Sequence, residues 1–414
     1  MHAHKNQGES RTGGGDGILK NWWPLLLTLV IQAMVAMALL TLPVMAPVVA
    51  QSLQVSPALV GLYVSVTYAG AMVATLLGGA TVARLGAIRV SQWGLLLCAL
   101  GLLLCAVPWF PAMALGAVLI GLGYGPITPA SSHLLARTTP QDQMALVFSL
   151  KQTGVPLGSM LAGAIVPPLL WVMNWQASLA AVALVCVLCA WVAQALRAEL
   201  DSDRRPEAQV RLSSLIQPIR LVMAHRALLT MASCSFMFSM VQLSLTTYLV
   251  TFLHDDLSYG LVAAGLALSV TQMGGIGGRI AWGYVADRWL GARRMLLLLA
   301  SMMALGAMAS AFLTAQTPQS VVVVILVAFG ASAIGWNGVY LAEVARRAPP
   351  GMASMATGGT LAFTFLGVVV GPPMFGALSG LFGTYRAGFV GLMAMACISG
   401  TVLFWSQRPM RNAA

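Results

Sequence analysis

The chain has 414 residues, of which 59% are hydrophobic and only 8% are charged, and its net charge is +11. A soluble domain carries roughly 25% charged residues, so this composition excludes a water-soluble globular enzyme. Its lysines and arginines lie between apolar runs rather than on one face of a soluble domain, which argues against a nucleic-acid partner. We therefore expect an all-α integral membrane protein, held in a lipid bilayer.

A polar tail (1–21) precedes long apolar runs, which a dense charge cluster at 198–225 divides into two groups. A spanning helix needs about 20 residues, so we predict twelve spanning segments. Six form an N-terminal bundle (22–197) and six form a C-terminal bundle (226–407), which a short tail (408–414) follows. The predicted segments are 22–49, 58–82, 89–108, 112–136, 143–170, 175–196, 227–253, 259–286, 293–314, 319–345, 353–381 and 385–406.

The distribution of positive charge predicts the orientation. Of the 22 lysines and arginines, nineteen fall in the termini, the linker and the loops of one side, and Arg386 alone falls in the loops of the other side. The remaining two, Lys151 and Arg279, fall inside predicted helices. Because positively charged loops stay in the cytoplasm, we expect a multi-pass protein of the inner (plasma) membrane with both termini cytoplasmic.

Catalytic and cofactor motifs are absent from the sequence. It contains no H-E-x-x-H, no G-x-S-x-G and no phosphate-cradling lysine loop. The six cysteines lie in apolar runs, where we interpret them as small hydrophobic residues. An intramembrane enzyme is therefore disfavoured, and we expect neither a cofactor nor a metal.

Two short matches indicate an internal repeat. Residues 79–89 and residues 283–294 each follow an apolar helix and contain a glycine, an arginine five residues later, and then another glycine and more arginine, at an offset of 204. Residues 136–140 match residues 345–349 at an offset of 209. The two bundles are thus predicted to be parallel repeats, an arrangement that in transporters places the substrate site at their interface.

With these loops the sequence resembles the major facilitator superfamily, whose loop pattern is G-x-x-x-D-R-x-G-R-R. The resemblance implies a fold of two pseudo-symmetric six-helix bundles and assigns gating roles to Gly79, Arg84, Gly86, Gly283, Asp287, Arg288, Gly291, Arg293 and Glu343. In the family, the loop acid pairs with cations and a helix end to hold the cytoplasmic gate shut. The first copy has Ala83 in place of this acid and Ala87 in place of an arginine, which implies an intact latch only in the C-terminal half.

Two further stretches resemble narrower groups. Residues 149–154 (S-L-K-Q-T-G) are similar to those of cyanate and nitroimidazole-type porters, and Gly278 with Arg279 is similar to the eighth helix of monocarboxylate and oxalate–formate porters. In the latter groups this arginine contacts the substrate carboxylate.

Arg279 and Lys151 are the leading candidates for substrate binding, because an ionisable residue inside a spanning segment indicates function. Their predicted depths from the cytoplasmic end are roughly 10 and 12 Å. In the repeat they align with Thr75 and Thr360, so the charges are not needed for the scaffold of both halves. The alternative is that either side chain extends toward cytoplasmic water.

Other polar groups of the predicted helices complete a cavity or bond a neighbouring helix. These candidates are Gln32, Tyr124, Gln242, Trp336 and Asn337. Among the acids, only Glu343 falls in a predicted helix, near its cytoplasmic end, where it serves either as a gate partner of Arg288 or Arg346 or as a proton carrier.

The sequence thus predicts a secondary active transporter, functional as a monomer, for a small organic anion such as a monocarboxylate, with protons as the coupling ion. An anion site would have two cations, whereas a cation site in the membrane would lack its acid. The alternative is proton-driven efflux of neutral or amphiphilic drug-like compounds.

Overall fold

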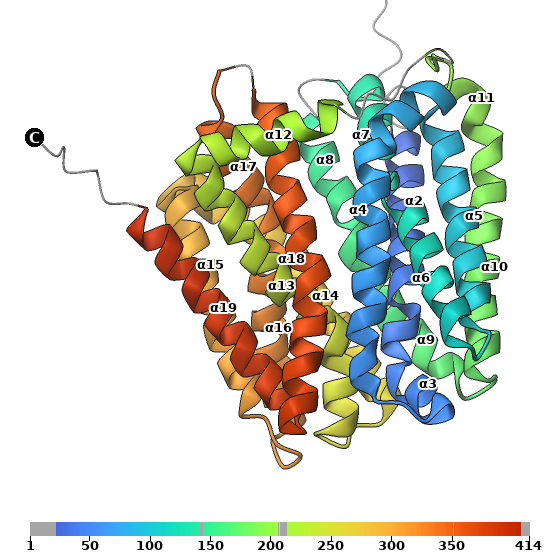
Figure 1. Cartoon of the computed structure of the whole chain (residues 1–414), viewed down its shortest axis with the longest axis vertical. Coiled ribbons are helices and arrows are strands. Elements are labelled where there is room, and N and C mark those ends of the chain that lie inside the picture. Colours follow the sequence, from blue (N-terminus) through green and yellow to red (C-terminus); the bar gives the residue numbers. More distant parts are fainter. Residues whose placement is uncertain (1–21, 141–143, 206, 208–212, 351, 407–414) are drawn as a thin grey trace, which may run out of the picture.

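The structure is a computed structural model that describes residues 22–140, 144–205, 207, 213–350 and 352–406 (Figure 1). The predicted tails (1–21 and 408–414) and part of the predicted linker (206 and 208–212) lie outside the described residues. Every element of the described residues is a helix, as the sequence predicts.

Six segments make up the N-terminal half, and several are interrupted by short breaks. In order they are α2 (Trp23–Val44) with α3 (Ala46–Leu53), η1 (Pro57–Leu59) with α4 (Val60–Leu85), α5 (Ala87–Cys105), α6 (Phe110–Tyr124) with α7 (Ile127–Thr138), α8 (Met144–Gln152) with α9 (Gly154–Leu169), and α10 (Trp175–Ala193). The linker contains η2 (Gln194–Leu196), α11 (Arg197–Leu200) and α12 (Ser213–Ala224).

The C-terminal half repeats this pattern. Its segments are α13 (Arg226–Asp255), α14 (Leu261–Val285) with the π-helical turn η3 (Ala286–Leu290), α15 (Ala292–Ala311), α16 (Gln319–Gly335) with α17 (Asn337–Arg347), α18 (Ala353–Phe382) and α19 (Tyr385–Trp405).

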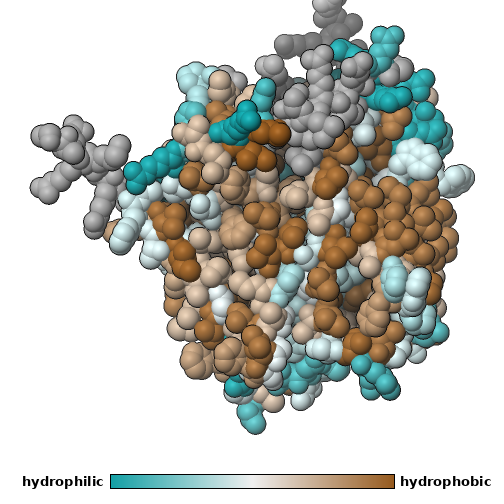
Figure 2. Space-filling model, in the orientation of Figure 1, coloured by the Kyte–Doolittle hydropathy of each residue, from teal (hydrophilic) through white to brown (hydrophobic). Residues whose placement is uncertain are grey.

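Eleven helices among the described residues are long and apolar enough to cross a membrane. The remaining predicted segment, 143–170, consists of α8 and α9, which meet at Thr153 and are each shorter than the roughly 20 residues of a span. Figure 2 shows hydrophobic residues over the middle of one face and polar residues gathered at its two ends, as a bilayer requires.

The two halves lie side by side and meet most closely at the end away from the linker (Figure 1). There Tyr248 Oη donates to the carbonyl of Ala58 at 2.6 Å, and Ser65 Oγ donates to the carbonyl of Val369 at 2.7 Å. Gly163 and Gly265 let α9 and α14 approach so closely that a Cβ on either would collide with the other's backbone. We call the opposite end, where α11 and α12 lie, the linker end.

Candidate functional site

Arg279 on α14 joins the two halves between these contacts and the linker end. Its Nη1 donates to the carbonyl of Gln152 at 2.6 Å and its Nε donates to the carbonyl of Ile334 at 3.1 Å. Both carbonyls lie at helix breaks, since α8 ends at Gln152 and α16 ends at Gly335. Pro156 has no N–H to bond the Gln152 carbonyl four residues earlier, so the arginine supplies the missing donor.

Thr75, the counterpart of Arg279 in the other half, makes a hydrogen bond equivalent to the one between Arg279 and Ile334. Thr75 Oγ1 donates to the carbonyl of Gly125 at 2.9 Å, at the break between α6 and α7. Gly125 precedes Ile334 by 209 residues, the offset of the second repeat match. A threonine hydroxyl therefore suffices to satisfy the carbonyl at this break. The charge of Arg279 and its reach into the N-terminal half exceed what the scaffold requires.

Lys151, near the end of α8, is fully buried, and its Nζ has no hydrogen-bond partner among the described residues. The charged group that interacts with it electrostatically is Arg279, a second cation. Among the described residues, no acid forms an ion pair with either of them. Burying a charge is costly unless it is paired, so this pair of cations is suited to a bound anion.

Two predicted residues of the N-terminal half lie near this pair. Gln32 is fully buried against Gly154, directly after the α8–α9 break, and its Nε2 has no hydrogen-bond partner among the described residues. Its Oε1 accepts a hydrogen bond from Thr128 at 3.4 Å. Tyr124 interacts electrostatically with Arg279, and its ring lies edge-on to that of Tyr68 at 5.7 Å.

The three predicted residues of the C-terminal half form a cluster of their own. Gln242 Oε1 accepts hydrogen bonds from Trp336 Nε1 at 2.9 Å and from Asn337 Nδ2 at 3.4 Å. Asn337 Nδ2 also lies 3.5 Å from the Ile334 carbonyl that Arg279 contacts, so the cluster adjoins the cation pair through this break. Trp336 is buried and packs edge-on against the rings of Phe238 and Tyr340, so its side chain is held in place by packing.

Of the predicted gate residues of the N-terminal half, Gly86 lies against the linker. Gly79 and Arg84 are exposed near the end of α4, and Gly86 links α4 to α5 with a φ of 95°. Asp201, which follows α11, accepts hydrogen bonds from the backbone N–H groups of Ile88 at 2.8 Å and Arg89 at 3.0 Å. Ala83 has no carboxylate to offer, but the linker supplies one to the same loop.

A second linker acid extends this contact to α7. Asp203 pairs with Arg137, and its Oδ2 lies 2.7 Å from His133 Nε2. Burial alone would raise the pKa of the Asp203 carboxyl, but the His133 hydrogen bond and the Arg137 charge outweigh it and hold that pKa below its ordinary value. Sequence reasoning missed both linker acids, because no local signal distinguishes Asp201 and Asp203 from the other charges around them.

The predicted gate residues of the C-terminal half are arranged differently. Gly283 lies on α14, and Asp287 and Arg288 are exposed on η3. Gly291 joins η3 to α15 with a φ of 73°. Among the described residues Asp287 forms no ion pair, so the latch that the resemblance implies is not engaged in this conformation.

Glu343 on α17 pairs with two arginines of its own helix. Its Oε1 lies 2.6 Å from Arg347 Nη2, and its Oε2 lies 3.5 Å from Arg346 Nε. Arg293 Nη2 donates to the carbonyl of Leu403 at 2.9 Å and so fixes the start of α15 to the end of α19.

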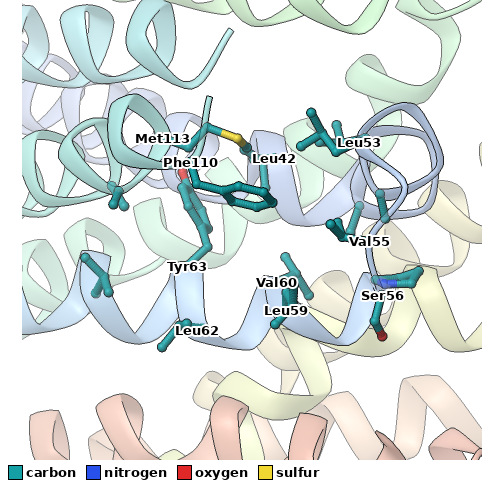
Figure 3. Close-up of a pocket in the computed structure, with 17 residues that line it drawn as sticks. Leu42, Leu53, Val55, Ser56, Leu59, Val60, Leu62, Tyr63, Phe110 and Met113 are labelled. Atoms are coloured by element: carbon teal, nitrogen blue, oxygen red, sulfur yellow. The ribbon is translucent and has the colours of Figure 1, made fainter. Parts of the chain in front are cut away.

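An apolar pocket of about 190 Å³ lies within the N-terminal half, apart from the cation pair (Figure 3). Its walls come from α2, α3, η1, α4 and α6 and include Leu42, Leu59, Tyr63, Phe110 and Met113. None of the seven predicted substrate residues is among the residues that line it.

Comparison with known proteins relates the sequence to a family. The sequence profile of the Major Facilitator Superfamily matches residues 25–361. An uncharacterized MFS-type transporter of Mycobacterium tuberculosis is 28% identical over 261 residues, which are 62% of this chain. The match covers 56% of that relative, so the chain spans about half its length.

Two further matches extend over nearly the whole chain. A benzoate transport protein of Acinetobacter baylyi is 22% identical over 93% of this chain and 89% of its own. A crystal structure of the nucleoside transporter NupG superposes with a TM-score of 0.79 at 16% identity, over 93% of this chain and 100% of the other. The structural likeness shows a shared fold. The profile match is to a family of membrane transporters, which are not enzymes.

Proposed function

The chain belongs to the Major Facilitator Superfamily, and we propose that it is a secondary transporter that carries a small organic anion across the membrane by alternating access. The observation that carries the proposal is Lys151, a fully buried lysine without a hydrogen-bond partner among the described residues, beside the cation Arg279. A carboxylate between the two would pair both charges, whereas a cationic substrate would add a third positive charge.

A monocarboxylate suits the two cations best. Arginine offers a planar fork of N–H donors that matches a carboxylate, and lysine adds a point charge. The two existing bonds of Arg279 use Nε and Nη1, and Nη2 takes part in neither. Tyr124, Trp336 and the amides of Gln32, Gln242 and Asn337 would enclose the rest of the molecule. The name of the benzoate transport protein agrees with this substrate class.

Transport would proceed by rocking of the two halves about this site. The contacts that join Tyr248 with Ala58 and Ser65 with Val369 lie away from the linker, so in this conformation the site would open toward the linker end. The excess of arginine in the linker and the loops beside it supports a cytoplasmic position for this end, in the inner membrane. We propose that a proton accompanies the anion and that one chain suffices for transport.

Ligand-induced thermal stabilisation of the purified full chain tests the substrate class. A matched set of probes, benzoate, benzamide and benzylamine, keeps the ring and changes only the charge. A ligand that binds the native state raises its melting temperature by mass action, so we expect benzoate or a related small carboxylate to raise it, and the amide and amine to have no effect.

Lys151→Met tests the residue assignment, because it keeps nearly the length of the side chain and removes its charge. The variant is expected to lose the response to carboxylates, while the exposed control Arg220→Gln keeps it. An equal response of Lys151→Met and wild type, or stabilisation by benzylamine, would refute the anion site. Uptake into proteoliposomes that is not accelerated by external acid would refute proton co-transport.

Efflux of neutral or amphiphilic compounds is the second candidate function. The apolar pocket of Figure 3 favours it, because its walls are almost entirely apolar and two of its residues, Leu59 and Phe110, are exposed, as entry of an apolar compound requires. Stabilisation by neutral amphiphiles alone, unchanged in Lys151→Met, would favour this function over anion transport.

A further inference from the structure

The linker ends of the two halves are related by the repeat, but their carboxylates lie in different places. Gly86 and Gly291 occupy equivalent positions before α5 and α15, and Arg137 and Arg346 occupy equivalent positions near the ends of α7 and α17. In the N-terminal half, Asp201 bonds the first N–H groups of α5 and Asp203 pairs with Arg137. The chain thus places its own two anions between a helix N-terminus and an arginine.

The equivalent place in the C-terminal half is an open hollow of about 430 Å³. It is lined by Leu290, Gly291, Ala292, Arg293, Arg294, Glu343 and Arg346. Gly291, the N-cap residue of α15, makes no side-chain cap hydrogen bond of its own, and a Cβ on it would meet no atom of the described residues within 4 Å, whereas a Cβ on Gly86 would collide with Asp201. Among the residues that line the hollow, Glu343 is the one acid.

The charge in this hollow is strongly positive. Three arginines line it, and the carboxylate of Glu343 is already paired with Arg346 and with a fourth arginine, Arg347. Arg293 Nε is buried without a hydrogen-bond partner among the described residues. The side chains of Arg294 and Arg346 are exposed, so both have room to turn toward a ligand.

We propose that this hollow binds a phosphate-bearing anion, which takes the place that Asp201 and Asp203 occupy in the N-terminal half. Phosphate matches the donor set, because free N–H groups at a helix start and arginine forks both bind its oxygens. The site is separate from the cation pair, since Leu290 lies eleven residues beyond Arg279 in the sequence, roughly 16 Å along a helix axis. It therefore does not depend on the proposed transport function.

Two sources of phosphate fit the position. The hollow lies where helices end, at the level of lipid headgroups, and it also opens to the solution. Melting temperatures of the purified full chain with phosphatidylglycerol, with phosphatidylcholine, or with inorganic phosphate against chloride at equal ionic strength distinguish the two sources. Stabilisation by phosphatidylglycerol alone identifies a lipid headgroup, and stabilisation by inorganic phosphate identifies a soluble ligand.

The double variant Arg294→Gln/Arg346→Gln tests the location. Both side chains are exposed, so the protein is expected to fold, and the stabilisation should fall by at least half. The control Arg220→Gln/Arg226→Gln removes two exposed charges at the linker end but outside the hollow, and it should respond like wild type. Equal losses in the two double variants, or no stabilisation of wild type by either phosphate source, would overturn the proposal.

Discussion

Gly86 and Gly291 both begin the third helix of their half with a positive φ, of 95° and 73°, yet their surroundings differ. The side chain of Asp201 fills the space beside Gly86, whereas a Cβ on Gly291 would meet no atom of the described residues within 4 Å. The difference teaches that a repeat keeps the backbone turn while the side chains around the exposed helix N-terminus change from one half to the other.

Thr75 and Arg279, within the membrane, also share a backbone contact while their side chains differ between the halves. Both donate a hydrogen bond to a carbonyl at a helix break of their own half, at Gly125 and Ile334. Only the arginine also crosses to the other half, where it reaches Gln152 and adds a charge beside Lys151. Comparing the halves therefore separates the scaffold role, which both residues share, from the charge that one half alone carries.

The largest expected effect is on stability, from alanine at the two equivalent glycines. Both glycines combine a positive φ with a ψ near 150°, a region that is nearly exclusive to glycine and costs a residue with a Cβ about 1–3 kcal/mol. Overpacking adds about 1–3 kcal/mol at Gly86. Gly86→Ala is therefore expected to lower the free energy of unfolding by more than Gly291→Ala, which has room for its Cβ. Denaturant unfolding in detergent measures both, and equal losses would contradict the role of Asp201 in the turn.

The second-largest expected effect is on transport, from the replacement of Arg279 by threonine, the residue at the equivalent position 75. Arg279→Thr keeps a donor for the Ile334 carbonyl but removes the charge, so anion uptake should fall roughly 10- to 100-fold, as expected when a charge-assisted hydrogen bond of about 1.5–3 kcal/mol is lost. The melting temperature serves as the control for folding. Uptake at the wild-type rate would mean that the arginine is scaffold, like Thr75.

A smaller effect is expected where the linker contacts α5. Asp201→Asn removes the charge at the N-terminus of α5 and weakens its hydrogen bonds by about 1 kcal/mol. Trypsin should then cleave after the exposed Arg204 several times faster, because the linker detaches more often. Glu343→Gln, the matched change in the C-terminal half, should leave this cleavage rate unaltered, and an unchanged rate in Asp201→Asn would argue against the contact.

The smallest expected effect is the change with pH in the stability that the Asp203 carboxylate contributes. Its pKa is lowered in the folded chain, so its contribution to stability is present above the unfolded value of about 3.9 and is lost as the pH falls through the folded value. The difference in melting temperature between wild type and Asp203→Asn should therefore shrink below about pH 4. A difference that stays constant down to about pH 3 would show that its contacts with Arg137 and His133 add no stability.

The sequence by itself determined the helical membrane fold, the two-half repeat and the two cations inside the helices. These follow from the length of apolar runs, from the spacing of Gly and Arg in the loops, and from the rarity of charge in a spanning segment, which are all local properties. The break between α8 and α9 was harder to predict, because it depends on which partner replaces the N–H that Pro156 lacks.

Only the tertiary structure decided which groups the functional side chains hydrogen-bond. Arg279 bonds a carbonyl 127 residues away, and Asp201 bonds an N–H 113 residues away, while Lys151 is left with none among the described residues. From the sequence, Gln242, Trp336 and Asn337 are expected either to complete a cavity or to bond a neighbouring helix, and the packing of α13 against the α16–α17 break brings them within hydrogen-bond distance of one another. A hydrogen bond depends on atoms within about 3 Å, and that distance is set by how whole helices pack, which no local pattern in the sequence encodes.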